Sequence, residues 1–121
     1  MITETREFRE RFQRMEWQRQ LGNLASTMAR IAAGAPLPQR DPLVADLLRE
    51  AALFIEWTAP KVPQDFLVEL AALQREVLAW RKAWPIEGAR PLLALEARNR
   101  SDRLLQMAGL VGPDVERAPG S

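Results

Sequence analysis

The sequence predicts an all-α fold, an antiparallel up-and-down bundle of about four helices with a long first helix and a disordered C-terminal tail. Two observations carry this prediction. Apolar residues recur at helical spacing along four segments, and proline or glycine separates each segment from the next. We expect residues 1–110 to form a single helical domain and residues 111–121 to be a flexible tail.

The first helix is predicted from Glu4 to Ala33, because a threonine precedes it and Gly34, with two prolines beyond, follows it. At a rise of about 1.5 Å per residue, such a helix is about 45 Å long. The other helices are predicted to have about 20 residues, and so to be about 15 Å shorter. The N-terminal third of this helix is therefore expected to extend beyond its neighbours.

The second helix is predicted to begin at Asp41 and Pro42, an N-cap followed by proline at the first helical position, and to end before Pro60. The loop that follows is short, so the third helix, predicted over Gln64–Trp84, should lie antiparallel beside the second. Its apolar residues have the 4-3-4-3-4 spacing of coiled-coil-like packing: Phe66, Leu70, Leu73, Val77, Trp80 and Trp84.

The fourth helix is predicted to carry Pro91 in its first turn and to end at Gly109, with Leu110 folding back in a Schellman motif. Arg100 interrupts its apolar stripe. A charge at such a position must reach solvent or pair with a carboxylate, and Glu69 or Glu76 of the third helix can supply one. We therefore expect a structural ion pair between the last two helices.

The composition removes most catalytic chemistry. The chain has no His, Cys or Tyr, so the commonest general base, the thiolate nucleophile and the usual zinc ligands are all missing. Its six glycines form no phosphate-binding loop. We therefore predict that the protein is not an enzyme and has no cofactor and no metal site.

A change of apolar face within the first helix is the leading candidate for function. Phe8, Phe12 and Met15 cluster on one side, whereas the apolar residues from Trp17 onward cluster on nearly the opposite side. One straight helix cannot direct both stripes at one core, so Phe8, Phe12 and Met15 are predicted to bind a second copy or another protein. The alternative is a bend, or a break near Gly22, that lets both stripes reach the same core.

Leu53 and Trp57 are a second candidate contact, because they lie one turn apart and outside the core stripe of the second helix. If exposed, Trp57 would be a strong anchor for a protein partner. A central helix that packs on two sides would instead bury both residues, and this is the interpretation that we favour.

An arginine cluster on the fourth helix supports an alternative function. Arg98, Arg100 and Arg103 could bind a small anionic ligand or nucleic acid. The net charge is only +1, with 17 Lys and Arg against 16 Asp and Glu, so nucleic acid is not expected as a partner.

We therefore expect a non-catalytic helical protein-protein interaction module that self-associates, as a homodimer, or docks on a larger assembly. No apolar run approaches the roughly 18 residues that a membrane span needs, and the N-terminus does not resemble a secretory signal. A cytoplasmic location is the corresponding expectation.

Overall fold

The computed structural model describes residues 6–110, and within this range all regular secondary structure is helical, without strands. The prediction of an all-α fold is confirmed. The α-helices of this range are α1 (Arg6–Gln13), α2 (Trp17–Gly34), α3 (Asp41–Thr58), α4 (Leu67–Ala83) and α5 (Arg90–Met107). Short 3₁₀ turns at Pro38–Arg40, Ala59–Lys61, Gln64–Phe66 and Glu87–Ala89 connect or extend them. The predicted tail, residues 111–121, lies outside the described residues.

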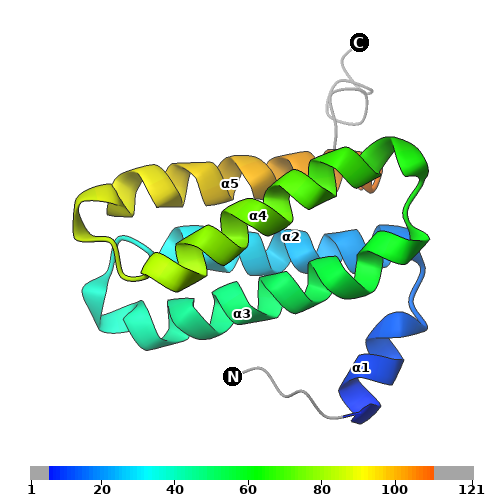
Figure 1. Ribbon diagram of the computed structural model, residues 1–121, viewed down its shortest axis with the longest axis horizontal. Coiled ribbons are helices and arrows are strands. Elements are labelled where there is room, and N and C mark those ends of the chain that lie inside the picture. Colours follow the sequence, from blue (N-terminus) through cyan, green and yellow to red (C-terminus); the bar gives the residue numbers. More distant parts are fainter. Residues whose placement is uncertain (1–5, 111–121) are drawn as a thin grey trace.

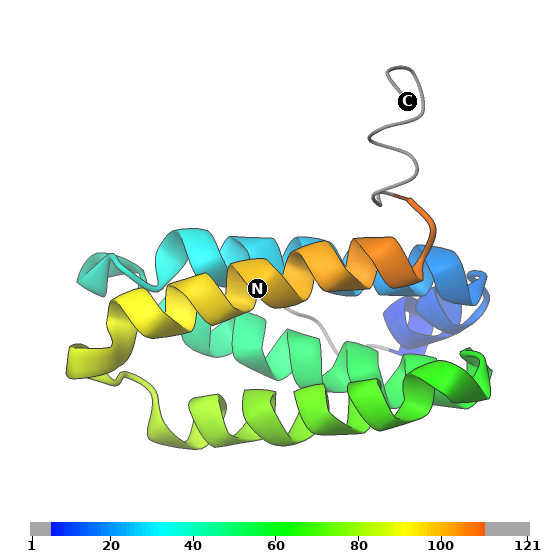
Figure 2. The same cartoon turned by 90° about the horizontal axis from the view of Figure 1, so that it is seen from above.

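Consecutive long helices run in opposite directions, and α2 lies between α3 and α5 (Figure 1). Helix α2 packs along both α3 and α5, whereas α4 packs mainly on α3. Figure 2 shows that α4 lies on the side of α3 that faces away from α2. One hydrophobic core contains side chains from α1 through α5.

The predicted long first helix is wrong, because α1 and α2 are separate helices. The break lies at residues 14–16, where Glu16 has an extended backbone (φ −66°, ψ 151°), and not near Gly22. The buried Gln20 side chain donates from Nε2 to the carbonyl oxygen of Phe12 at 2.9 Å, and so binds the end of α1. The ammonium of Lys61 donates to the carbonyl oxygen of Gln13 at the same helix end.

Gly22 is instead the position at which Leu110 approaches α2. It lies inside α2, and a Cβ at this position would be 2.9 Å from Cδ1 of Leu110. Leu110 reaches this position through the predicted Schellman motif: Gly109 has a φ of 75°, and the Leu110 N–H donates to the carbonyl oxygen of Leu105 at 3.0 Å. The C-terminal end of α5 therefore folds back onto α2.

The boundary of α3 agrees with the sequence to within one residue, but its predicted cap is wrong. Helix α3 begins at Asp41 with Arg40 at the N-cap position and no side-chain capping hydrogen bond. The Asp41 carboxylate does not cap the helix because it pairs with Arg90, 49 residues away.

Candidate interaction surface

The side chains predicted to form an N-terminal contact surface pack inside the molecule. Phe12 is 2% exposed, and its ring stacks on Phe54 of α3 with 4.4 Å between centroids. Phe8 is half-buried and stacks on the same ring at 6.1 Å, and Met15 is half-buried against the core. The expectation of an uncovered stripe is therefore wrong, because the break after α1 turns these side chains toward α3.

The second predicted pair lies in the same aromatic cluster. Trp57 is buried, with its ring centroid 5.6 Å from that of Phe12, and Leu53 is half-buried against the core. Helix α3 packs on α2 and α4, and its flank receives α1. Trp57 is therefore packed within the chain, as the favoured interpretation of the sequence had it.

Two arginines of the predicted cluster are paired with carboxylates of α4. Arg100 donates from Nε to Glu76 at 2.9 Å, which is one of the two partners that the sequence predicted. Arg103 forms a two-pronged pair with Glu69, at 2.7 and 3.0 Å. These hydrogen bonds raise the pKa of both arginines, and the Arg103 bond lowers the pKa of Glu69.

Only Arg98 of the predicted cluster lies apart from these pairs, exposed on α5. Beneath the pairs is an apolar hollow of about 40 Å³, between side chains of α4 and α5. Ligand pockets usually have about 300–1,000 Å³. The cluster therefore joins α4 to α5 and leaves little room for a small anionic ligand.

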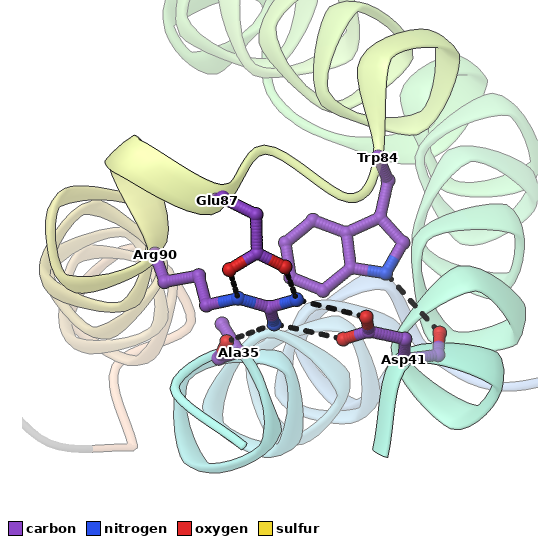
Figure 3. Close-up of polar contacts among 5 residues, drawn as sticks. All are labelled: Ala35, Asp41, Trp84, Glu87 and Arg90. Atoms are coloured by element: carbon purple, nitrogen blue, oxygen red, sulfur yellow. Dashed lines mark hydrogen bonds and ion pairs between the residues drawn. The ribbon is translucent and has the colours of Figure 1, made fainter. Parts of the chain in front are cut away.

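At the other end of the long helices, Arg90 is the centre of a second group of polar contacts, which the sequence did not indicate (Figure 3). These contacts link the segments that connect the helices. The Arg90 side chain is 7% exposed and binds both carboxylate oxygens of Asp41 at 2.8 Å. It also donates to Glu87 at 2.7 and 3.2 Å and to the carbonyl oxygen of Ala35 at 3.0 Å. The guanidinium carbon lies 5.3 Å from the ring centroid of Trp84.

All five N–H groups of this guanidinium are used in these bonds, so none remains for a ligand. Hydrogen bonding by Arg90 holds the pKa of both Asp41 and Glu87 below the ordinary values. The Trp84 indole donates to the backbone oxygen of Asp41 at 3.1 Å. We call these five residues (Ala35, Asp41, Trp84, Glu87 and Arg90) the Arg90 clamp and assign it a structural role, because it fastens α3, α5 and two loops together.

The outward face of α4 is the most unusual surface of the molecule. Eleven of the 17 residues of α4 are apolar, yet only Leu70, Leu73 and Val77 are buried. Val68 is 81% exposed, and Leu78 and Leu67 are 43% and 38% exposed. A helix that is apolar on more than one face normally packs on more than one side, and α4 packs mainly on α3.

A groove between α3 and α4 continues this apolar face. Its volume is about 320 Å³, and its walls are almost entirely apolar. The residues that line it are Ile55, Glu56, Ala59, Leu67, Leu70, Ala71 and Gln74. The Oε1 atom of Gln74 is buried and accepts no hydrogen bond within residues 6–110. We call the groove together with the exposed Leu67, Ala71 and Leu78 and the half-buried Gln74 the α4 face.

The described residues hold no group of three or more His, Cys, Asp or Glu side chains that could bind a metal ion. None of the helices within residues 6–110 is both long and apolar enough to cross a membrane. Comparison with known protein families, with curated proteins and with solved structures finds no match for the chain.

Proposed function

We propose that this protein is a non-catalytic helical interaction module that self-associates through the α4 face. The observation that carries the proposal is the apolar composition of α4, of which only Leu70, Leu73 and Val77 are buried. Burial of exposed apolar area stabilises an association by about 25 cal/mol per Å². Covering Leu67 and Leu78 in a dimer therefore supplies a driving force that the single chain leaves unused.

The α4 face differs from the other exposed apolar side chains in its continuity. Leu67, Ala71, Gln74 and Leu78 have the 4-3-4 spacing of a helix-packing seam and lie beside a groove. The exposed Leu92 and Leu95 of α5 do not line this groove. Isolated exposed leucines are common on protein surfaces, whereas a continuous apolar stripe marks a contact site.

The alternative, an anion-binding protein that uses Arg98, Arg100 and Arg103, has less support. Two of these three guanidinium groups already bind Glu76 and Glu69, and an anion would have to displace those carboxylates. The non-catalytic part of the proposal rests on a composition without His, Cys or Tyr.

Solution mass tests the proposal. We expect light scattering over a range of protein concentrations to show a dimer for the wild-type protein and a monomer for Leu78→Glu, because a charge in the contact must be desolvated. Leu92→Glu is the matched control, a leucine exposed on α5 and outside the α4 face, and it should leave the dimer intact. Circular dichroism should show the same helix content in all three proteins.

Two results would contradict the proposal. A wild-type protein that stays monomeric at every concentration has no self-association to explain. A dimer that Leu92→Glu disrupts and Leu78→Glu does not would place the contact on α5 instead of α4.

A further inference from the structure

We infer that two copies of this chain pair with their α4 helices antiparallel, and that charges at the two ends of the α4 face fix this direction. The inference rests on the proposed function, because it names the partner of the same surface. It concerns a different property, however, namely the orientation and the register of the pair.

The α4 face has opposite charges at its two ends. Glu56 lines the groove beside the N-terminal half of α4, and Arg81 and Lys82 occupy its last turn. All three side chains are exposed, and none takes part in the ion pairs within residues 6–110. The surface thus has a negative group beside the N-terminal half of α4 and positive groups in its last turn. Along α4, the mostly apolar stripe and the exposed Arg75 lie between them.

A second copy is the partner that this charge pattern fits. In a two-fold symmetric contact the same patch of both copies meets itself. If the α4 helices run antiparallel, Glu56 of each copy meets Arg81 and Lys82 of the other copy. If they run parallel, the like charges meet, which is unfavourable. The charges therefore favour the antiparallel arrangement.

The apolar residues give the register of this pair. Leu67 and Leu78 are symmetric about the midpoint between Ala72 and Leu73. An antiparallel pair centred there places Leu67 of one copy against Leu78 of the other, at both ends of the contact. Gln74 then lies about 2 Å along the helix from the two-fold axis.

Disulfide cross-linking tests the direction, because the chain has no cysteine of its own. We expect a mixture of the variants Leu67→Cys and Leu78→Cys to form a mixed disulfide dimer under mild oxidation. Neither variant alone should cross-link efficiently, because in the antiparallel pair its two copies of the new side chain lie about 16 Å apart along the helix. A disulfide requires the two Cα atoms to be within about 7 Å.

A charge exchange tests what fixes the direction. In the homodimer of Glu56→Lys, and equally in that of Arg81→Glu/Lys82→Glu, like charges meet at both ends. We expect each homodimer to be about tenfold weaker than the wild type, since several exposed ion pairs are lost. In a mixture of the two variants, opposite charges meet again at both ends, so the heterodimer should recover the wild-type affinity. Arg98→Glu, on α5, is the control and should leave the dimer unchanged.

The outcomes separate this inference from the proposed function. A dimeric wild type in which each cysteine variant cross-links with itself overturns the antiparallel arrangement but leaves self-association through α4 in place. A heterodimer no tighter than the two homodimers removes the role of Glu56, Arg81 and Lys82. A monomeric wild type overturns the proposed function, and the inference with it.

Discussion

Helices α2 and α4 have nearly the same length but very different surroundings. Helix α2 has 18 residues, of which nine are apolar and nine are buried, and it packs on α3 and α5. Helix α4 has 17 residues, of which eleven are apolar and three are buried, and it packs mainly on α3. The more apolar helix is therefore the less buried one.

Apolar side chains in these two helices contribute to different processes, folding in α2 and association in α4. In α2, apolar area is removed from water when the chain folds, so it contributes to the free energy of unfolding. In α4, much of that area stays exposed after folding, and it can contribute only when another surface covers it. We therefore expect substitutions in α2 to change stability and substitutions on the α4 face to change association.

The largest effect is expected from a cavity in α2. Leu24 is fully buried at the centre of the bundle, so Leu24→Ala removes packed methyl groups and leaves a void. We expect the free energy of unfolding to fall by about 2–5 kcal/mol. Urea unfolding followed by circular dichroism measures it. A loss as small as that of an exposed leucine would contradict the central position of α2.

Loss of the Arg90 clamp should have the next largest effect on stability, because its hydrogen bonds connect α3 to α5. Arg90→Gln leaves Asp41 without its two-pronged partner and breaks the hydrogen bond to Ala35. We expect a melting temperature several degrees lower than that of the wild type. Arg98→Gln, which removes an exposed arginine of the same helix, is the control and should change it little.

The clamp also predicts how stability depends on pH. The pKa of Asp41 is held below its ordinary value of 3.8 by the Arg90 hydrogen bonds, so its contribution is fully present above that value. It is lost as the pH falls through the lowered pKa. We expect Asp41→Asn to be less stable than the wild type at neutral pH, and the difference to shrink as the pH falls below about 4. Urea midpoints over this pH range measure it, and a constant difference would contradict the assignment.

The sequence predicted those features that depend on neighbours along the chain. The seam of α4, the Schellman motif at Gly109 and the boundary of α3 all follow from local spacing or backbone requirements. The Arg100–Glu76 pair was predictable too, because a charge within an apolar stripe requires a nearby carboxylate.

The change of apolar face indicated a possible break in the predicted first helix but did not give its position. The change of apolar face between Met15 and Trp17 marks the right place, but residues 13–16 include neither glycine nor proline. All of them are good helix formers, so local propensity gives no signal. Stacking of Phe12 on Phe54, 42 residues away, outweighs that propensity.

The Arg90 clamp was missed for a related reason. Its members come from four parts of the chain, and Asp41 alone looks like a helix cap. The sequence does not single out the α4 face, because the stripe of Leu67, Ala71 and Leu78 lies beside the seam that packs on the core, and spacing alone does not show which of the two is covered.

Each of the two ion pairs between α4 and α5 should contribute little to stability. The Arg100 side chain is 41% exposed and that of Arg103 is 45% exposed, so water and salt screen their interactions with Glu76 and Glu69. We expect Arg100→Ala to lower the free energy of unfolding by no more than about 1 kcal/mol, and added salt to reduce the difference. A much larger loss would show that α4 depends on this pair for its position.

Substitutions on the α4 face are expected to have the smallest effect on folding. They also test most directly the difference between α2 and α4. Leu78→Gln replaces an exposed leucine with a residue of similar helix propensity, so unfolding of the monomer, measured at high dilution, should change by no more than about 0.5 kcal/mol. Leu73→Gln, one turn and a half away on the buried side of the same helix, should be strongly destabilising, because it buries an amide in the core. At concentrations where the wild-type protein self-associates, Leu78→Gln should lose the added stability that rises with concentration. If Leu78→Gln instead destabilises the dilute monomer as much as Leu73→Gln does, the outward face of α4 belongs to the fold, and the difference between α2 and α4 carries no function.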